Sequence, residues 1–413
     1  MFIPPRNNIQ AGRLRASDMA LPARAVLALF GAMASLPCHA ALSDTIHPFA
    51  ALTYSYDSNL LRLPDDQPGV DVRSDTLRAG VAGLSFERPV GRQLFTGSAK
   101  VTRVSFDHFN QLDYNGKDAS LDWQWQLGNH WSGNAGGTYA QSLTPFTDFH
   151  SSERNLRVQR GRYVEADWRV LADWQLHART SHNTFDYNLS SQRYLDRIED
   201  ANIVGFDYLG ANGNTVGLQA TRIEGKYPNK LVFGQFVFDQ GYTQDKLQLK
   251  VHWNLSGVTQ LEFLGGRAKR THDVFSQLDA SGTNGRVKAS WAPHGNLHLT
   301  SNVWREFVAF EGSNASYSLN KGASIGATWN ATAKIKAEAN YRYERRDFPG
   351  LVGAAVPLNG RDTTRGTSAV VTYAPTNSVQ LVLSLTQEER SASQFISSAY
   401  RTHGASFTAS LQF

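Results

Sequence analysis

The sequence predicts an all-β protein, a transmembrane antiparallel up-and-down β-barrel of the bacterial outer membrane with about eighteen strands. Three observations support this fold class. The last residues of the chain alternate strictly between apolar and polar or small side chains. The connections between alternating segments fall into a short class and a long class, and most tryptophans lie beside the short ones.

The C-terminal segment is the clearest predicted strand. Its apolar residues are Ala405, Phe407, Ala409, Leu411 and Phe413, and glycine or polar residues stand between them. This period of two describes a strand between hydrocarbon and a wetter compartment. Phe407, Leu411 and the final Phe413 resemble the terminal signature that barrel-insertion machinery reads in bacterial outer-membrane proteins. The alternative is an edge strand of a soluble β-sandwich.

The N-terminal segment 1–40 is predicted to be a signal peptide. Arg24 precedes an apolar stretch at 25–36, and Ala40 is the expected last residue before cleavage. Met19 is an alternative start that gives a signal of conventional length. The remaining residues, 41–413, are expected to form a single outer-membrane barrel domain.

Cys38 is the only cysteine of the chain. It permits a lipoprotein interpretation, but Ser35-Leu36-Pro37 is a poor lipobox. Cleavage after Ala40 would leave a mature chain without cysteine, so its stability would not come from disulfides.

The composition excludes a helical membrane protein. Hydrophobic residues make up 41% of the 413 residues, and no run of about 18 apolar residues follows the first 40. The formal charge is +5, but residues 1–40 hold four arginines against one aspartate. Subtracting that +3 leaves the mature chain at +2. Barrel strands stay compatible with this composition because lumen residues alternate with the lipid-facing ones.

The connections sort by length, as expected when periplasmic turns are short and extracellular loops are long. The short turns are expected at 89–91, 128–130, 172–173, 211–214, 256–258, 293–296, 330–332 and 375–378. The longer loops are expected at about 57–73, 108–116, 144–153, 187–200, 225–240, 271–283, 311–316, 347–361 and 390–398. Alternating these connections gives an even number of strands with both termini on the short-turn side. A soluble sandwich has no reason to sort its connections in this way.

The predicted strands alternate clearly in most places. In 333–344 the odd residues are apolar or tyrosine, and the even ones are charged or asparagine. The segment 246–254 repeats the pattern. Around 78–86 and 101–106 the apolar phase slips by one residue, which predicts β-bulges there.

Tryptophans gather at one predicted height of the barrel. Seven of the nine lie within a few residues of short turns, namely Trp125, Trp131, Trp168, Trp174, Trp253, Trp291 and Trp329. An aromatic belt at the membrane interface explains this placement, whereas packing in an ordinary core gives no reason for it. Because an open sheet edge is costly in lipid, the first strand, near 50–56, is expected to pair with the last.

The polar phase of the clearer strands predicts a lumen with a modest excess of basic residues. The candidate lumen-path residues are Lys100, Arg157, Arg169, Arg179, Lys246, Lys250, Arg286, Lys288, Lys334, Lys336 and Arg342. The opposing acidic residues are Asp122, Glu165, Asp167, Asp207, Glu262, Glu338 and Glu344. One hypothesis is a path for anionic or polyhydroxylated solutes, and the other is a lattice of ion pairs that braces the barrel.

No enzyme is predicted. The chain has no nucleophile elbow, no His-Glu-x-x-His and no phosphate-binding glycine loop, and its histidines lack metal-ligand spacing. We therefore expect no catalytic residue, no metal and no cofactor. The segment 210–214 is most simply a hairpin turn. Nucleic-acid binding is not expected, because the basic residues follow strand parity and form no patch with aromatics.

One segment resembles a known family. Tyr56-Asp57-Ser58-Asn59-Leu60-Leu61-Arg62, at the end of the first predicted strand, is similar to the opening of the exosortase-associated exopolysaccharide outer-membrane proteins (EpsL type). The segments 341–349 and 361–365 also look similar. The resemblance implies a role in exopolysaccharide biosynthesis and export. For Tyr56, Asp57, Asn59 and Arg62 the alternative is a hydrogen-bonded cluster that stabilises a loop at the outer mouth.

Two functions follow from these expectations. The main one is a passive export channel in the outer membrane, whose partners would be a polysaccharide or oligosaccharide, outer-membrane lipid, the barrel-insertion machinery and periplasmic polysaccharide-export components. The alternative is a general or oligosaccharide-uptake porin. An outer-membrane barrel enzyme is a third, less favoured class. Lumen chemistry barely separates export from uptake, since both need polar walls that bind hydroxyl groups.

Overall fold

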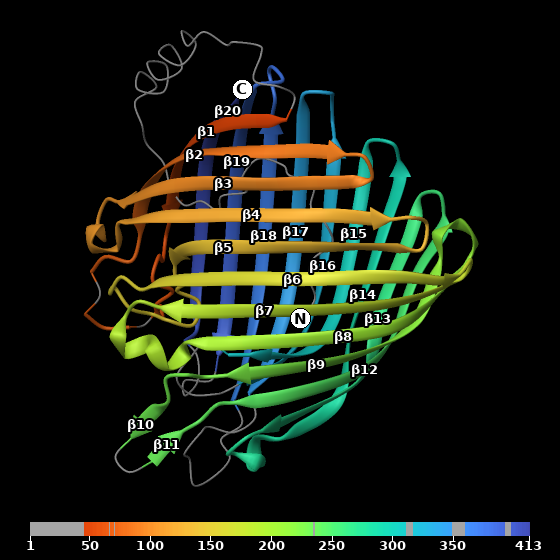
Figure 1. The fold of residues 1–413 in the computed structure, drawn as a ribbon. Helices are drawn as coiled ribbons and strands as arrows, with labels where there is room; N and C mark the ends of the chain where they lie inside the picture. The colour runs from red at the N-terminus through yellow and green to blue at the C-terminus, as the bar shows by residue number, and fades with distance from the viewer. Residues whose placement is uncertain are drawn as a thin grey trace.

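The computed structural model describes residues 45–65, 67–69, 71–233, 236–310, 317–348, 360–392 and 398–413. These residues form one 18-stranded antiparallel sheet that closes on itself, with one small hairpin beside it (Figure 1). The predicted fold class is confirmed. The predicted signal peptide, Met19 and Cys38 lie outside the described residues.

The barrel strands are long and connect in chain order. The first nine are β1 (Ile46–Asp57), β2 (Asp75–Val90), β3 (Gln93–Phe106), β4 (Tyr114–Leu127), β5 (Trp131–Leu143), β6 (Leu156–Leu171), β7 (Trp174–Tyr187), β8 (Arg197–Leu209) and β9 (Thr215–Lys226). The other nine are β12 (Tyr242–Ser256), β13 (Thr259–His272), β14 (Ala280–His294), β15 (Leu297–Ala309), β16 (Tyr317–Asn330), β17 (Ile335–Phe348), β18 (Gly360–Tyr373), β19 (Val379–Ala392) and β20 (Tyr400–Gln412). Figure 1 shows β2 to β9 on the near wall and β14 to β19 on the far wall.

The remaining elements lie in connections. The hairpin of β10 (Leu231–Phe233) and β11 (Phe236–Phe238) lies between β9 and β12. The 3₁₀ turns within the described residues are η1 (Asn110–Leu112), η2 (Ser190–Leu195), η3 (Ala211–Gly213) and η4 (Ser276–Leu278). Among the described residues, no helix is long and apolar enough to cross a membrane. The predicted short turns all join strands at one end of the barrel, and the longer loops join them at the other.

The turn at 210–214 is a hairpin connection, as predicted. The Gly210 amide donates to the Asn214 carbonyl at 2.8 Å. Asn212 and Gly213 hold φ angles of 61° and 73°, the left-handed region that asparagine and glycine adopt most readily.

Closure is achieved where the chain ends meet. β1 pairs antiparallel with β20 from Phe49 opposite Gln412 to Asp57 opposite Gly404. Inside this seam the hydroxyl oxygens of Thr53 and Thr408 are 2.8 Å apart. The first strand therefore pairs with the last, as expected, and the sheet has no open edge to leave unpaired in lipid.

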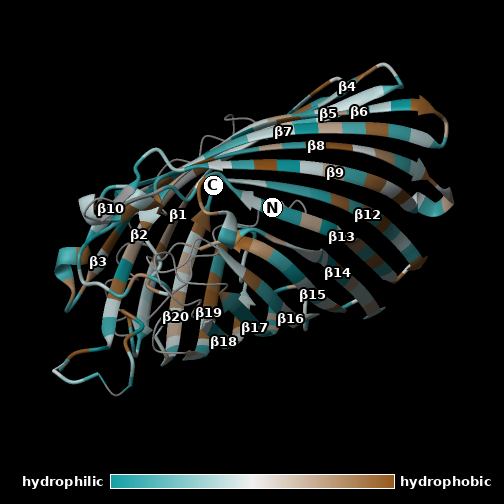
Figure 2. Ribbon diagram, turned by 90° about the horizontal axis from the view of Figure 1, so that it is seen from below, coloured by the Kyte–Doolittle hydropathy of each residue, from teal (hydrophilic) through white to brown (hydrophobic). Residues whose placement is uncertain are grey.

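The outer wall is apolar and the inner wall polar. Leu121, Val164, Leu247 and Ile325 are each more than half exposed, which in a barrel marks the lipid-facing phase. Apolar and polar bands alternate along the strands in Figure 2. All seven tryptophans expected in the belt lie near strand ends at the short turns, and the rings of Trp131 and Trp168 stack with centroids 5.3 Å apart.

The bulges predicted at 78–86 and 101–106 are absent, and that prediction was wrong. The β2–β3 register runs without a shift from Leu77 opposite Phe106 to Val90 opposite Gln93. The apolar phase slips there because Ala79 and Val104 face inward against leucines of the β1–β2 loop. Register shifts occur instead near short turns, at 169/171, 254/256 and 291/294.

Candidate functional site

The lumen wall carries most of the predicted path residues. Alternation with the lipid-facing residues places every one of them on the inward phase of its strand except Lys334. Lys334 lies in the turn before β17, which begins at Ile335, and its Nζ donates to the Pro375 carbonyl at 2.9 Å. The role of these residues as a solute path stays a prediction.

Most of these basic residues are paired with acidic residues nearby on the inner wall. The pairs are Lys100–Asp118 at 3.7 Å, Arg179–Glu165 at 2.5 Å, Lys250–Asp207 at 2.7 Å, Arg286–Glu306 at 2.9 Å, Lys288–Glu262 at 3.1 Å, Lys336–Glu338 at 3.2 Å and Arg342–Glu344 at 2.7 Å. His177 adds a contact to Asp207 at 2.8 Å. This arrangement matches the lattice of ion pairs that was the alternative hypothesis to a solute path. Asp118 and Glu306 were not among the predicted acidic residues.

Several lumen cations also lie against aromatic rings. The guanidinium carbon of Arg270 is 3.4 Å from the ring centroid of Tyr242, and that of Arg179 is 4.0 Å from Tyr163. Arg342 lies 4.6 Å from the ring of Trp304, an inward tryptophan whose Nε1 donates to Glu344. Cation–π contacts of this kind hold the charges in fixed positions on the wall.

The outer-mouth motif forms a compact hydrogen-bonded cluster. Asp57 pairs with Arg62 at 2.6 Å and accepts from the Asn59 amide at 2.8 Å. The Asn59 side chain binds both the amide and the carbonyl of Leu63. Arg62 holds a φ of 58°, a conformation that this local network supports. Tyr56, on the outward phase, is 40% exposed and makes no hydrogen bond to the other residues of this cluster within the described part of the chain.

This cluster directs the β1–β2 loop into the barrel. Leu60, Leu61 and Leu63 are buried against inward residues of β2 and β3. The motif therefore shapes the inner wall at the extracellular end, which is the loop-stabilising alternative considered for it.

A second loop crosses the lumen. Residues 144–155 connect β5 and β6, yet Asp148 contacts Arg346 of β17 at 2.8 Å and Arg390 of β19 at 3.1 Å. Both arginines are on the inward phase of their strands, so the loop reaches them through the interior. We call Asp148, Arg346, Arg390 and Asp362 the constriction cluster.

The constriction cluster is well paired and largely dry. Arg346 also binds Asp362 at 2.6 Å, and its side chain is 11% exposed. Arg390 is 5% exposed, and its Nε donates to the Thr364 hydroxyl at 3.2 Å. A second contact anchors the crossing loop on the β1–β2 loop, where a His150 ring nitrogen lies 3.0 Å from the Leu61 carbonyl.

The protonation states of Asp148 and His150 follow from their surroundings in the loop. Burial alone would raise the pKa of Asp148, but the guanidinium groups of Arg346 and Arg390 outweigh it and hold the pKa below the ordinary value. Burial lowers the pKa of His150, the bond to the Leu61 carbonyl opposes this, and the charge of Arg390 lowers it further. Asp148 is therefore ionised and His150 neutral near pH 7.

Sequence reasoning missed the constriction cluster. Arg346 and Arg390 continue the inward parity of β17 and β19, but Arg346 lies beyond the alternating segment 333–344 and Arg390 falls in the loop expected at 390–398. Asp148 lies in a loop, and no periodic signal shows that a loop folds inward. The described residues contain no group of three or more histidine, cysteine, aspartate or glutamate side chains that could hold a metal ion.

Comparisons with known proteins concern the fold only. No protein-family profile matches the sequence, and no curated protein matches it. Among solved structures, Pseudomonas aeruginosa OccK9 (OpdG) is 10% identical over 90% of this chain and 99% of that chain, with a TM-score of 0.48. P. aeruginosa OpdK with vanillate is 10% identical over 90% and 98%, with a TM-score of 0.47. The alcaligin receptor FauA from Bordetella pertussis is 12% identical over 90% and 76%, with a TM-score of 0.42.

The chain's own geometry defines its class. A closed barrel with an apolar outer wall, a polar inner wall and an aromatic belt is a bacterial outer-membrane β-barrel. The protein therefore resides in the outer membrane, with the short turns facing the periplasm and the long loops facing outward.

Proposed function

We propose that the protein is a passive diffusion channel for small polar solutes, particularly those carrying hydroxyl or carboxylate groups. The observation that carries the proposal is the crossing of the lumen by loop 144–155, held by Asp148 between Arg346 and Arg390. A barrel of 18 strands is too wide for side chains alone to fill. An inward loop narrows such a barrel to a size at which the lumen side chains contact the solute.

The lumen chemistry supports this solute class. Fixed arginines and lysines offer donors to hydroxyl and carboxylate oxygens, and the paired carboxylates offer acceptors. Because the charges are nearly balanced by pairing, we expect weak overall charge selectivity with local binding positions along the wall. Such walls bind weakly enough for the solute to leave, which conduction requires.

Exopolysaccharide export, implied by the sequence resemblance, stays a prediction. A polymer strand would have to share the lumen with loop 144–155 or displace it from the buried constriction cluster. This consideration favours the porin alternative over export for the barrel as described.

The test is permeation through the purified full-length protein in liposomes. A series of neutral sugars from monosaccharide to large oligosaccharide is offered, and swelling rates are compared with those of protein-free liposomes. We expect rates to fall steeply with solute size. Entry of long oligosaccharides as fast as monosaccharides would contradict a narrowed channel and favour polymer passage, and no swelling with any sugar would contradict diffusion altogether.

A further inference from the structure

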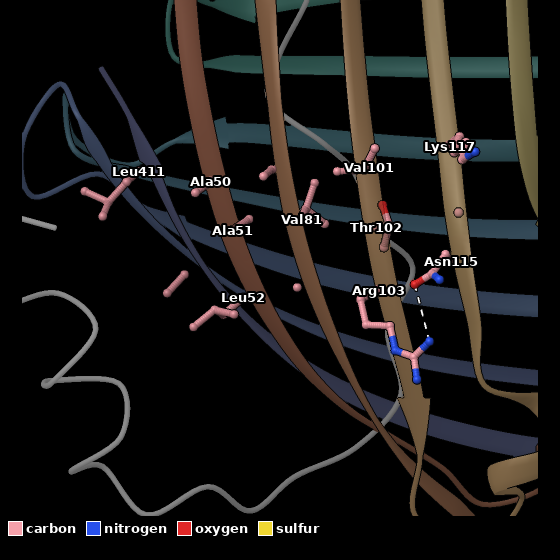
Figure 3. A pocket seen from close by; sticks show the side chains of 14 residues that line it. Ala50, Ala51, Leu52, Val81, Val101, Thr102, Arg103, Asn115, Lys117 and Leu411 are labelled. Carbon is pink, nitrogen blue, oxygen red and sulfur yellow. Dashed lines mark hydrogen bonds between the residues drawn. The ribbon is translucent and has the colours of Figure 1, made fainter. Parts of the chain in front are cut away.

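The outer wall of the barrel carries a groove that the channel function does not use. It has a volume of about 540 Å³ and crosses β20, β1, β2, β3 and β4 (Figure 3). Its outward residues are Ala409, Leu411, Ala50, Leu52, Gly80, Ala82, Val101, Arg103, Asn115 and Lys117. Elsewhere on the outer wall, outward positions hold larger side chains such as Leu121 and Val164. The hollow forms where the outward residues are small, namely Ala50, Gly80, Ala82 and Ala409.

The groove follows two adjacent rows of cross-strand partners. In one row Leu411 pairs with Ala50, and Ala82 with Val101, which in turn pairs with Lys117. Because barrel strands tilt, such a row climbs across the wall. It rises from Leu411, near the end of the chain, to Lys117 in the upper part of β4.

The upper end of the groove lies at the height of lipid headgroups. Lys117 is ten residues above Leu127, the last residue of β4 at the periplasmic end. A strand tilted as in outer-membrane barrels gains about 2.5 Å of height per residue, so Lys117 lies about 25 Å above that end, the height of the apolar band. Since the long loops mark the outer side, this is the outer leaflet.

Two cations face outward at this end. Arg103 is 59% exposed, donates to the Asn115 side-chain oxygen at 3.3 Å and lies 3.5 Å from Asp113. Lys117 is exposed, and within the described part of the chain it has no hydrogen bond or ion pair. Figure 3 shows both residues at one end of the groove, away from Leu411 and Ala50.

We propose that this groove binds one acyl chain of a phosphorylated glycolipid, the lipopolysaccharide of the outer leaflet, with a phosphate at Arg103 and Lys117. The apolar floor fits a hydrocarbon chain, and the two cations fit an anionic headgroup at the same height. The outer leaflet supplies this lipid directly at that height. The site is independent of the lumen, so it stands or falls separately from the channel proposal.

The test counts lipid bound to the full-length barrel in detergent by native mass spectrometry. Lipopolysaccharide is titrated as the probe, with its dephosphorylated form and phosphatidylglycerol as comparisons. We expect one tightly bound lipopolysaccharide, and weaker binding of both comparison lipids.

Two variants address the two halves of the site. The double change Arg103→Gln and Lys117→Gln removes the phosphate partners, and we expect about tenfold weaker binding of lipopolysaccharide. Ala82→Leu fills the groove from an exposed outward position and should weaken all three lipids. Each variant is first checked for the compact electrophoretic migration of a folded barrel.

Matched controls separate a groove from general attraction to the barrel surface. Arg162→Gln removes an exposed outward cation nine residues above Leu171, the last residue of β6, at nearly the height of Lys117. Ala119→Leu adds the same bulk at an exposed outward alanine that does not line the groove. Neither control should change binding of lipopolysaccharide.

Three results would each overturn the proposal. They are equal losses of binding in the variants and the controls, unchanged binding in the variants, and equal affinity for phosphatidylglycerol.

Discussion

At the scale of single residues, Asp148 connects the crossing loop to the far wall. Its carboxylate accepts hydrogen bonds from both Arg346 and Arg390, and the carbonyl of the neighbouring Thr147 accepts another from Arg390. The arginines keep other partners, including Asp362 and Thr364, so removing Asp148 should loosen the loop from the far wall and leave the barrel closed.

We expect Asp148→Ala to raise single-channel conductance and shift ion selectivity toward anions. The local cost is about 3 kcal/mol, because buried guanidinium groups lose a partner. The measurement is conductance and reversal potential in planar bilayers. Glu153→Ala is the matched control, since Glu153 is an exposed carboxylate in the same loop. Identical conductance in the two variants would contradict the role of the constriction cluster.

The pH dependence of the channel follows from the same carboxylate. The folded pKa of Asp148 lies below its ordinary 3.8. Its ion pairs therefore stabilise the loop at all pH values above 3.8, and this contribution is lost as the pH falls through the folded pKa. We expect conductance to stay constant from pH 7 to about pH 4 and to rise only below that range. A transition between pH 4 and pH 6.5 would instead indicate protonation of His150, because burial holds the pKa of this imidazole below its ordinary 6.5.

At the scale of elements, three loops end with the same leucine–aspartate pair. Leu112, Leu195 and Leu278 are buried. The aspartate that follows each leucine accepts a hydrogen bond from the backbone amide of a residue at the end of the preceding strand. The donors are Phe106, Tyr187 and His272, at 2.8, 2.7 and 2.8 Å. Two of the loops share the local sequence Phe-Asn/Ser-Gln-Leu-Asp, at 109–113 and 275–279. Each leucine packs in a cluster with a residue of the preceding strand, namely Leu112 with Val104, Leu195 with Phe185 and Leu278 with Ala268.

We expect Leu112→Ala to open the β3–β4 loop without unfolding the barrel. Leu112 is fully buried, so the change should cost about 3 kcal/mol and speed proteolysis of this loop about a hundredfold. The measurement is limited proteolysis of the folded protein in detergent. Leu121→Ala, on the lipid-facing side of β4, should leave the cleavage rate unchanged. Equal rates in the Leu112 variant and the unaltered protein would show that the leucine does not hold the loop.

At the scale of the whole molecule, closure depends on the β1–β20 seam. The Thr53 and Thr408 side chains touch across it on the lumen side. We expect Thr53→Cys with Thr408→Cys to form a disulfide under oxidising conditions, since the two positions are directly opposite. The barrel should then resist heat in detergent until a reductant is added. Thr53→Cys with Thr402→Cys is the control, because Thr402 lies six residues further along β20, and cross-linking in that pair would contradict the register.

Much of the architecture was determined by local alternation. The period of two in 405–413 and 246–254 sets which side chains face lipid, and the turn lengths set which end faces the periplasm. Both signals are local, so the sequence carries them directly. Trp131 and Trp168 likewise mark a membrane interface because their position relative to a turn fixes their height.

The arrangement of the interior was decided only by the tertiary structure. The one-residue shift of the apolar pattern near Ala79 and Val104 was interpreted as β-bulges from the sequence. In the structure these two residues instead pack against leucines of the β1–β2 loop, which is separated from β3 in sequence. The meeting of Asp148 with Arg346 and Arg390 spans about 200 residues or more of chain, with separations of 198 and 242. Strand alternation fixes only the direction of a side chain at its own position. Which loop fills a barrel, and which charges it meets there, depends on closure, since closure alone brings the distant walls within reach of one another.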